Sequence, residues 1–206
     1  FDVSAQEARA RYETMKMIQK EKLNLVLPGA MRDNDVEMWI HVMQDANADA
    51  LALDLAVSIR MTIPDTTCFV VFTDRGDDGI ERAVFGACRG DRDLYSISGS
   101  EEDLGPYVAK IDPKNIALNM SRDYPVANGM SYTGYHHLIE IIGEKYVDRF
   151  ISAEGVISDF RVRRVSSELI VFGKMAEIQR QIMEEAYRSI VPGVTTREGL
   201  GWWVQD

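Results

Sequence analysis

The stretch that most constrains the fold of this chain is its C-terminal segment, residues 166–206. Ser166 is a good helix N-cap, and Glu168 places a negative charge in the first turn, where backbone N–H groups are exposed. Apolar side chains then recur at helical spacing. They are Leu169, Phe172, Met175, Ile178, Ile182, Ala186 and Ile190. The pattern predicts one complete amphipathic helix.

A second helix is expected directly after it. Pro192-Gly193 stops the first helix, and Thr195 with Glu198 has the spacing of a capping box that opens another. Trp202 and Trp203 follow. We expect such a helix to continue and to bury its tryptophans, so we interpret the chain as the front part of a longer protein. The alternative is a short C-terminal helix packed on the preceding domain.

The order of several short motifs carries a family resemblance. Ser167-Glu168-Leu169-Ile170, then Ile190-Val191-Pro192-Gly193-Val194-Thr195-Thr196, then Trp202-Trp203, together resemble the entry into the catalytic domain of the creatinase, prolidase and Xaa-Pro aminopeptidase family. Upstream, Leu27-Pro28-Gly29-Ala30-Met31-Arg32 followed by Met38-Trp39-Ile40 resembles the start of the N-terminal domain in the aminopeptidase-like branch.

The resemblance implies an α/β fold. Residues 1–160 would form a three-layer mixed sheet with flanking helices, as in the N-terminal domain of this family. Residues 161–206 would form a linker and the incomplete beginning of an α+β pita-bread metallopeptidase domain. Alternation of strand and helix signals after an opening helix independently favours a mixed sheet with helices on its faces.

The resemblance also implies a function for the parent protein. Family members hydrolyse the peptide bond before proline, using two divalent ions (manganese, cobalt or zinc) that activate a bridging water. Their ligands lie downstream of the Pro-Gly-Val-Thr turn, so no catalytic, metal or cofactor residue is carried onto this chain, and alone it should be inactive. Its implied roles are homodimer assembly and walling of a neighbour's active site, with proline-containing peptides as the parent's substrates. The alternatives are a non-catalytic assembly or binding module related to the family, or a standalone dimerisation domain.

The charge distribution limits the partners. The net charge is −10; residues 1–155 hold 16 Lys and Arg against 26 Asp and Glu, whereas residues 156–206 hold 7 of each. An acidic lobe joined to a neutral one fits two packing units. Nucleic-acid binding and docking to an anionic membrane both need clustered positive charge, so neither is expected. No apolar run approaches the length of a membrane span. We expect a cytoplasmic protein, with an export signal further upstream left open.

The two cysteines, Cys68 and Cys88, are not in a Cys-x-x-Cys pair, which argues against a thiolate zinc site. They lie on strands expected to pair through a turn at residues 76–79. The pattern favours two buried thiols over a disulfide.

The remaining elements follow from periodicity and turn residues. Helices are predicted over residues 5–33, with a break or kink at Pro28-Gly29, over 100–110 and over 131–142; strands are predicted over 36–43, 67–72, 80–87, 94–97, 115–119 and 150–153. Residues 44–66 are predicted to be a loop or helix.

Three histidines are the first candidates for a site. His41 sits among apolar strand residues, which favours a hydrogen-bonded core histidine over a metal ligand. His136 and His137 are adjacent on a predicted helix and point in different directions, so they cannot both face one metal. Only Glu140 has helical spacing from His136, and a solvated or packing role is favoured for the pair.

The other clusters favour structural roles. Asp74, Asp77 and Asp78 lack the spacing of a calcium loop and are predicted to be solvated turn residues; Asp91 with Asp93, and Glu101-Glu102-Asp103, are interpreted as turn and helix-start residues. Ser98-Gly99-Ser100 is expected to be a turn that feeds a cap, and no nucleophile elbow or phosphate loop is present. The basic cluster Arg161-Val162-Arg163-Arg164 is predicted to form interdomain ion pairs, and Trp202 and Trp203 to pack within the second domain.

Overall fold

The computed structural model describes residues 3–44, 49–59 and 67–205. The chain divides into two compact units, Phe1–Val165 and Ser166–Asp206. The first is an α/β unit built on a six-stranded mixed sheet, and the second is a pair of helices. Each unit is considered by itself below.

The chain opens with a long helical segment that changes its winding. Helix α1 (Val3–Glu21) passes into a π-helical turn, η1 (Lys22–Val26), and then into α2 (Leu27–Asp33). Pro28 lies in the first turn of α2, where its missing N–H costs no intrahelical bond. The predicted break at Pro28-Gly29 is therefore a π-helical turn just before the proline rather than an end of the helix.

The main sheet has the strand order β6-β4-β3-β1-β7-β8. The strands are β1 (Met38–Gln44), β3 (Thr67–Asp74), β4 (Ile80–Gly86), β6 (Ile97–Gly99), β7 (Ile116–Leu118) and β8 (Phe150–Ser152). Strand β3 is antiparallel to both of its neighbours, with Val42 opposite Phe69 and Phe69 opposite Phe85, while the other pairings are parallel. A separate two-stranded ribbon joins β2 (Val57–Ile59) and β5 (Cys88–Gly90).

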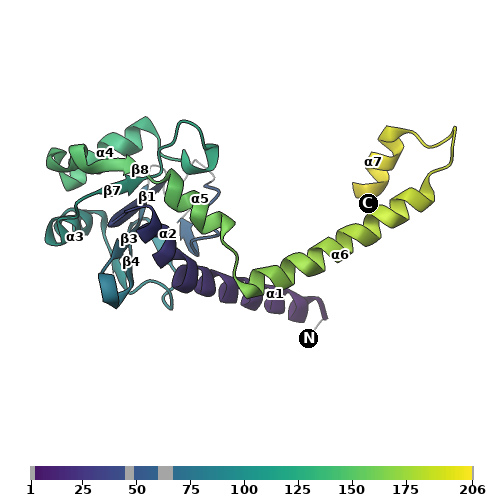
Figure 1. Cartoon of the computed structure of the whole chain (residues 1–206), viewed down its shortest axis with the longest axis horizontal. Helices are drawn as coiled ribbons and strands as arrows, with labels where there is room; N and C mark the ends of the chain where they lie inside the picture. The colour runs from purple at the N-terminus through teal and green to yellow at the C-terminus, as the bar shows by residue number, and fades with distance from the viewer. Residues whose placement is uncertain (1–2, 45–48, 60–66, 206) are drawn as a thin grey trace. The chain divides into compact units, whose positions relative to one another are not determined.

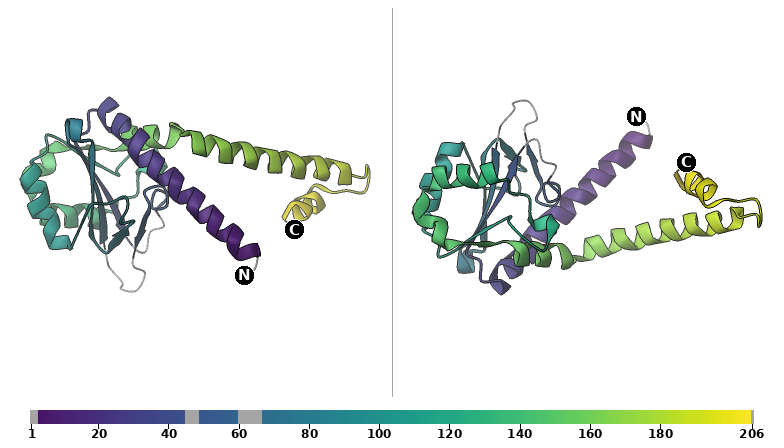
Figure 2. Two further views of the ribbon diagram at one scale, coloured as in Figure 1. Left: turned by 90° about the horizontal axis from the view of Figure 1, so that it is seen from below. Right: turned by 90° about the horizontal axis from the view of Figure 1, so that it is seen from above.

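Apolar side chains fill both faces of the sheet. Every residue of β1 except Gln44 is buried, as the unbroken apolar run predicts. Trp39, Val70 and Phe72 belong to the core that η1, α2 and α5 (Glu154–Val162) also enter. Ile40, Phe69 and Val71 belong to the core on the opposite face, with α3 (Leu104–Ile111) and α4 (Tyr132–Ile142). Figures 1 and 2 show these helices on the two sides of the sheet.

The helix caps of the first unit agree with the sequence signals. Ser100 and Asp103 form a reciprocal capping box at η3 (Glu101–Asp103), which leads into α3. Ser131 caps α4 by accepting a hydrogen bond from the Gly134 amide, and Gly143 ends the helix with a positive φ of 96°. Three further 3₁₀ turns complete the unit: η2 (Gly76–Asp78), η4 (Pro125–Ala127) and η5 (Glu144–Arg149).

The sequence reasoning missed three elements. Strands β2 and β5 form the separate ribbon, and α5 follows the predicted strand at residues 150–153, where no helix was predicted. The strand predicted over 94–97 begins only at Ile97, so Ser98 and Gly99 lie on β6 rather than in a turn. Residues 44–66 were predicted to be a loop or helix, and residues 45–48 and 60–66 of this segment lie outside the described residues. In the described part, residues 50–56 form turns that lead into β2.

The cysteine prediction was wrong: Cys68 and Cys88 form a disulfide. The ladder pairs Cys68 with Gly86, and Gly86 then turns the chain with a φ of 80°. That turn brings Cys88 across from Cys68, with their Cα atoms 4.9 Å apart, which is within the range that a disulfide spans. A positive φ at a strand end is not visible in the spacing of the two cysteines.

The second unit consists of α6 (Ser166–Ser189), a turn at Pro192-Gly193, and α7 (Arg197–Gln205). The predicted cap of α7 needs a correction. Thr196, not Thr195, accepts the hydrogen bond from the Gly199 amide, while the Thr195 hydroxyl accepts one from the Val191 amide in the turn. Among the described residues, no helix combines the length and the apolar character needed to cross a bilayer.

Candidate functional site

Functional side chains in α/β sheets gather where parallel strands end, and the first unit has such a place at the carboxyl ends of β1 and β7. His41, near the end of β1, is fully buried, and its Nε2 lies 2.9 Å from Asp49 Oδ2. The other carboxylate oxygen of Asp49 accepts a hydrogen bond from the Leu51 amide at 2.7 Å. His41 is therefore a hydrogen-bonded core histidine, as predicted.

Asn119 ties Val42, the residue after His41, to the neighbouring strand. It follows β7 directly and is fully buried. Its side-chain amide donates to the Val42 carbonyl at 2.8 Å and accepts from the Val42 N–H at 2.9 Å. These two bonds extend the pairing of β1 with β7 past Leu118, where the backbone ladder ends. Both backbone groups of Val42 are satisfied in this way.

The loop after β7 closes over the pair. The amides of Gly129 and Met130 both donate to the Asn119 carbonyl at 3.1 Å. A Cβ at Gly129 would lie 2.9 Å from Asp49 Oδ2 and 3.1 Å from Asn119 Nδ2, so glycine permits this approach. Nearby, the Ser131 hydroxyl donates to Gln44 Oε1 at 2.6 Å. We name His41, Asp49, Asn119 and Gly129 the His41 cluster.

The electrostatics of the His41 cluster favour an ionised carboxylate. Burial alone would raise the pKa of Asp49, but the hydrogen bond and charge of His41 and the backbone amides of Leu51 and Ala52 hold that pKa below its usual value. The Nδ1 atom of His41 is buried and has no hydrogen-bond partner. The arrangement orients an imidazole and holds a buried charge, which fixes the segment after β1 against the loop before α4.

The structure brings together no catalytic constellation from the other histidines. His136 contacts the rings of Tyr132 and Tyr135, at centroid distances of 4.4 and 5.5 Å. His137 lies with its Nε2 2.6 Å from Glu101 Oε1 and its ring 6.1 Å from Phe69. Of the solvated or packing role predicted for the two residues, these ring contacts fit the packing role. Within residues 3–44, 49–59 and 67–205, no group of His, Cys, Asp and Glu side chains could hold a metal ion.

One acidic residue differs from its prediction. Asp77 and Asp78 are exposed in η2, but Asp74 forms a two-pronged ion pair with Arg32, at 2.8 and 2.9 Å. The Arg32 hydrogen bonds hold the pKa of Asp74 below its usual range. These two residues line an open pocket of about 490 Å³, together with Glu37 and Lys114. Arg32 lies 42 positions before Asp74, too far for spacing to reveal the pair.

The remaining predicted clusters act within their own neighbourhoods. Asp91 Oδ2 lies 2.8 Å from Lys16 Nζ. Asp91 Oδ1 accepts a hydrogen bond from the Asp93 amide, which stabilises the turn at residues 91–93. In the basic cluster, Arg161 pairs with Asp54, and Arg163 with Asp33 and Asp159, so the ion pairs of these two arginines lie within the first unit. Within the described residues Trp202 and Trp203 are 63% and 37% exposed, and their packing within a longer second domain stays a prediction.

Sequence reasoning missed Asp49, Asn119 and Arg32 as structural partners. A polar residue directly after a short buried parallel strand was the available signal for Asn119. Comparison with known proteins adds no relative: no family model, no curated protein and no solved structure matches this chain.

Proposed function

We propose that this chain is the N-terminal portion of a Xaa-Pro aminopeptidase- or dipeptidase-like metallopeptidase of the creatinase and prolidase family. The first unit then corresponds to the family's N-terminal domain, and the second to the entry into its pita-bread domain. The parent hydrolyses the peptide bond before proline with two divalent ions. The residues described for this chain serve in homodimer assembly and in walling a neighbour's active site.

The exposed apolar residues of the second unit carry the proposal. In α6 only Ser167 and Ala186 are buried, and α7 has no buried residue. The large apolar side chains of α6 nevertheless keep helical spacing, and Phe172 and Ile178 are 46% and 57% exposed. An apolar stripe of this length requires a cover. A catalytic domain that continues from α7 supplies that cover, and the Pro-Gly-Val-Thr turn stands where the family resemblance places it.

The first unit is compatible with this role. Its mixed sheet with helices on both faces is the architecture that the resemblance implies. In the His41 cluster, His41 pairs with Asp49 and Asn119 binds the backbone of Val42, and such internal contacts suit a scaffold. A scaffold domain leaves the metal chemistry to the domain that follows.

The activity is tested on the protein expressed from its whole reading frame. We expect Mn²⁺-dependent hydrolysis of a Gly-Pro peptide, with the matched Gly-Ala peptide as a control, and loss of the activity with a chelator. Hydrolysis of neither peptide with manganese, cobalt or zinc would exclude the peptidase. The alternative is a non-catalytic assembly or binding module related to the family.

The cover over α6 has its own test in the same protein. Ile178→Asp should lower the melting temperature by several degrees, because it places a charge in an apolar contact. Gln179→Asp adds the same charge one position further along the helix and should change the melting temperature little. Equal effects of the two substitutions would show that the stripe is solvated. Light scattering should give twice the mass of one chain for a homodimer.

A further inference from the structure

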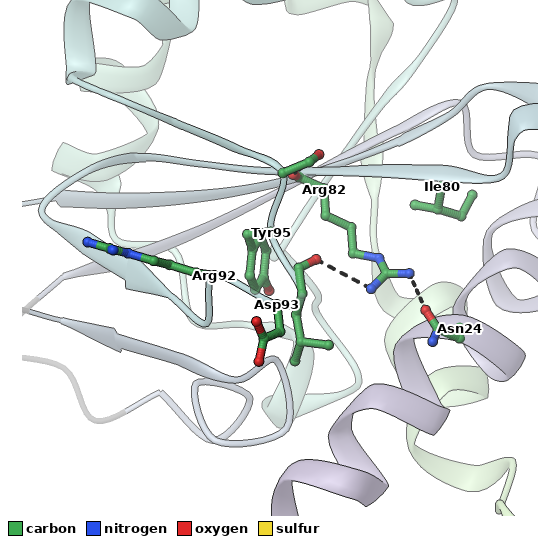
Figure 3. A pocket seen from close by; sticks show the side chains of 8 residues that line it. Asn24, Ile80, Arg82, Arg92, Asp93 and Tyr95 are labelled. Carbon is green, nitrogen blue, oxygen red and sulfur yellow. Dashed lines mark hydrogen bonds between the residues drawn. The ribbon is translucent and has the colours of Figure 1, made fainter.

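A half-buried arginine in the first unit lacks a charge partner. Arg82 lies on β4 and extends over the same face of the sheet as Phe72, its ladder partner, toward η1. Its Nη2 donates to Asn24 Oδ1, and its Nη1 lies 3.4 Å from the Leu94 carbonyl. Figure 3 shows these two bonds holding the guanidinium between the helix and the loop before β6.

Both of these acceptors are neutral. The Nε atom of Arg82 is buried and has no hydrogen-bond partner among the residues that the structure describes. Within the part of the chain that the structure describes, no carboxylate pairs with Arg82. Burial accordingly lowers the pKa of the Arg82 guanidinium below its usual value. A buried cation ordinarily has an anionic partner, because its desolvation is otherwise uncompensated.

The space beside Arg82 can accept such a partner. A pocket of about 310 Å³ is lined by Arg82, Asn24, Ile80 and the loop residues 92–96. Ser96 contributes a hydroxyl, and Tyr95 is fixed by a hydrogen bond to the Leu55 carbonyl. The carboxylate of Asp93 lies 3.9 Å from Lys16 Nζ, and Arg92 points away from Arg82 (Figure 3). Arg82 is therefore the cation that faces the hollow.

We propose that this pocket binds the carboxylate or phosphate group of a small molecule, with Arg82 as its charge partner. A planar guanidinium offers a fork of N–H donors that matches the oxygens of either group. Asn24 and Leu94 hold the fork in place before the ligand arrives, which reduces the entropy lost on binding. The proposal is independent of the peptidase assignment, since it concerns a different surface and requires no metal.

The test introduces a carboxylate of the protein itself beside Arg82, through the substitution Asn24→Asp. In Asn24→Asp the new oxygen keeps the hydrogen bond from Arg82 and supplies the missing negative charge. Melting temperatures of this chain are measured in sodium phosphate, sodium acetate and sodium chloride at one ionic strength. The unsubstituted protein should show a saturable rise in phosphate or in acetate over chloride, and the salt that produces it identifies the preferred group. Asn24→Asp should melt higher in chloride and lose the response to the anion.

Asn128→Asp is the matched control, because Asn128 is also exposed and its Oδ1 also accepts one hydrogen bond, from the Ser121 amide. This variant should keep the full anion response. Arg82→Lys should weaken the apparent anion affinity about tenfold, since a point charge replaces the fork. No rise over chloride in either salt, or an undiminished response in Asn24→Asp, would overturn the proposal.

Discussion

His41 Nε2 lies 2.9 Å from the carboxylate of Asp49, and the two side chains are only 0% and 7% exposed. A strand residue is thus tied to the segment that follows the strand, in a position from which water is excluded. Hydrogen bonds in such surroundings are electrostatically stronger than in water, and their loss leaves groups that no solvent can satisfy. The pair should therefore contribute to stability well beyond a surface ion pair.

Asp49→Ala should destabilise the first unit by about 2–4 kcal/mol, because His41 would then have no partner for either ring nitrogen. Urea denaturation followed by circular dichroism measures the change. Asp49→Asn keeps an acceptor oxygen and should cost clearly less. Equal losses in the two variants would mean that the hydrogen bond to His41 is not what matters.

The pair of Arg32 and Asp74 should make stability depend on pH. The folded protein holds the pKa of Asp74 below the ordinary 3.8, so the contribution is complete above that value and is lost as the pH falls through the lowered pKa. Asp74→Asn should remove about 1 kcal/mol at pH 7, since Arg32 is 46% exposed and solvent screens the pair. The difference in urea midpoint between the variant and the unsubstituted protein should be smaller at pH 3 than at pH 7. The same difference at both pH values would contradict this account.

Reduction of the Cys68–Cys88 disulfide should lower the stability of the first unit by about 3 kcal/mol, because the bond closes a loop with a sequence separation of 20. Melting curves with and without a phosphine reductant measure the effect. The double variant Cys68→Ala with Cys88→Ala should melt near the reduced protein and should not respond to reductant. A reductant effect of the same size in the double variant would assign it to something other than the disulfide.

Two glycines separate backbone strain from steric exclusion. Gly79 and Gly86 have φ values of 84° and 80°, but a Cβ at Gly79 meets open space, whereas one at Gly86 collides with the Thr67 carbonyl. Gly79→Ala should cost about 1–3 kcal/mol from the backbone alone, because a φ of 84° with a ψ of −153° is a combination that essentially only glycine adopts. Gly86→Ala should cost clearly more in urea denaturation, because the ladder to β3 must also shift. Similar costs would show that the strand moves freely at Gly86.

The fold was predictable where one segment contains its own signal. The β-branched run at Thr67, the capping serines Ser100 and Ser131, and the Pro192-Gly193 turn all mark elements that the structure contains. These signals are local, because they depend on backbone propensity and on hydrogen bonds within a few residues.

The partnerships were not predictable in the same way. Asp49 lies in a stretch without clear periodicity, and Asn119 contacts Val42 from 77 positions away. Arg82 stands in a strand whose pattern gives no reason for a cation on the buried face. Only the packing of η1 against the sheet brings Asn24 to it. Spacing in one sequence does not encode which distant segments meet.

The order of strands in the sheet has a consequence for how the first unit forms. Strands β1, β3 and β4 are neighbours in the main sheet, and each meets the next in an antiparallel ladder. In the chain only β2, which belongs to the separate ribbon, comes between them among the described residues. Strand β7 pairs in parallel with β1, and β8 pairs in parallel with β7. Parallel pairing needs a long crossover connection, so each of these strands can join only after the intervening chain has crossed over. Closing those longer loops costs entropy before any contact is gained. We therefore expect strands β1, β3 and β4 to pair first, so that their amides are the first to gain protection during refolding.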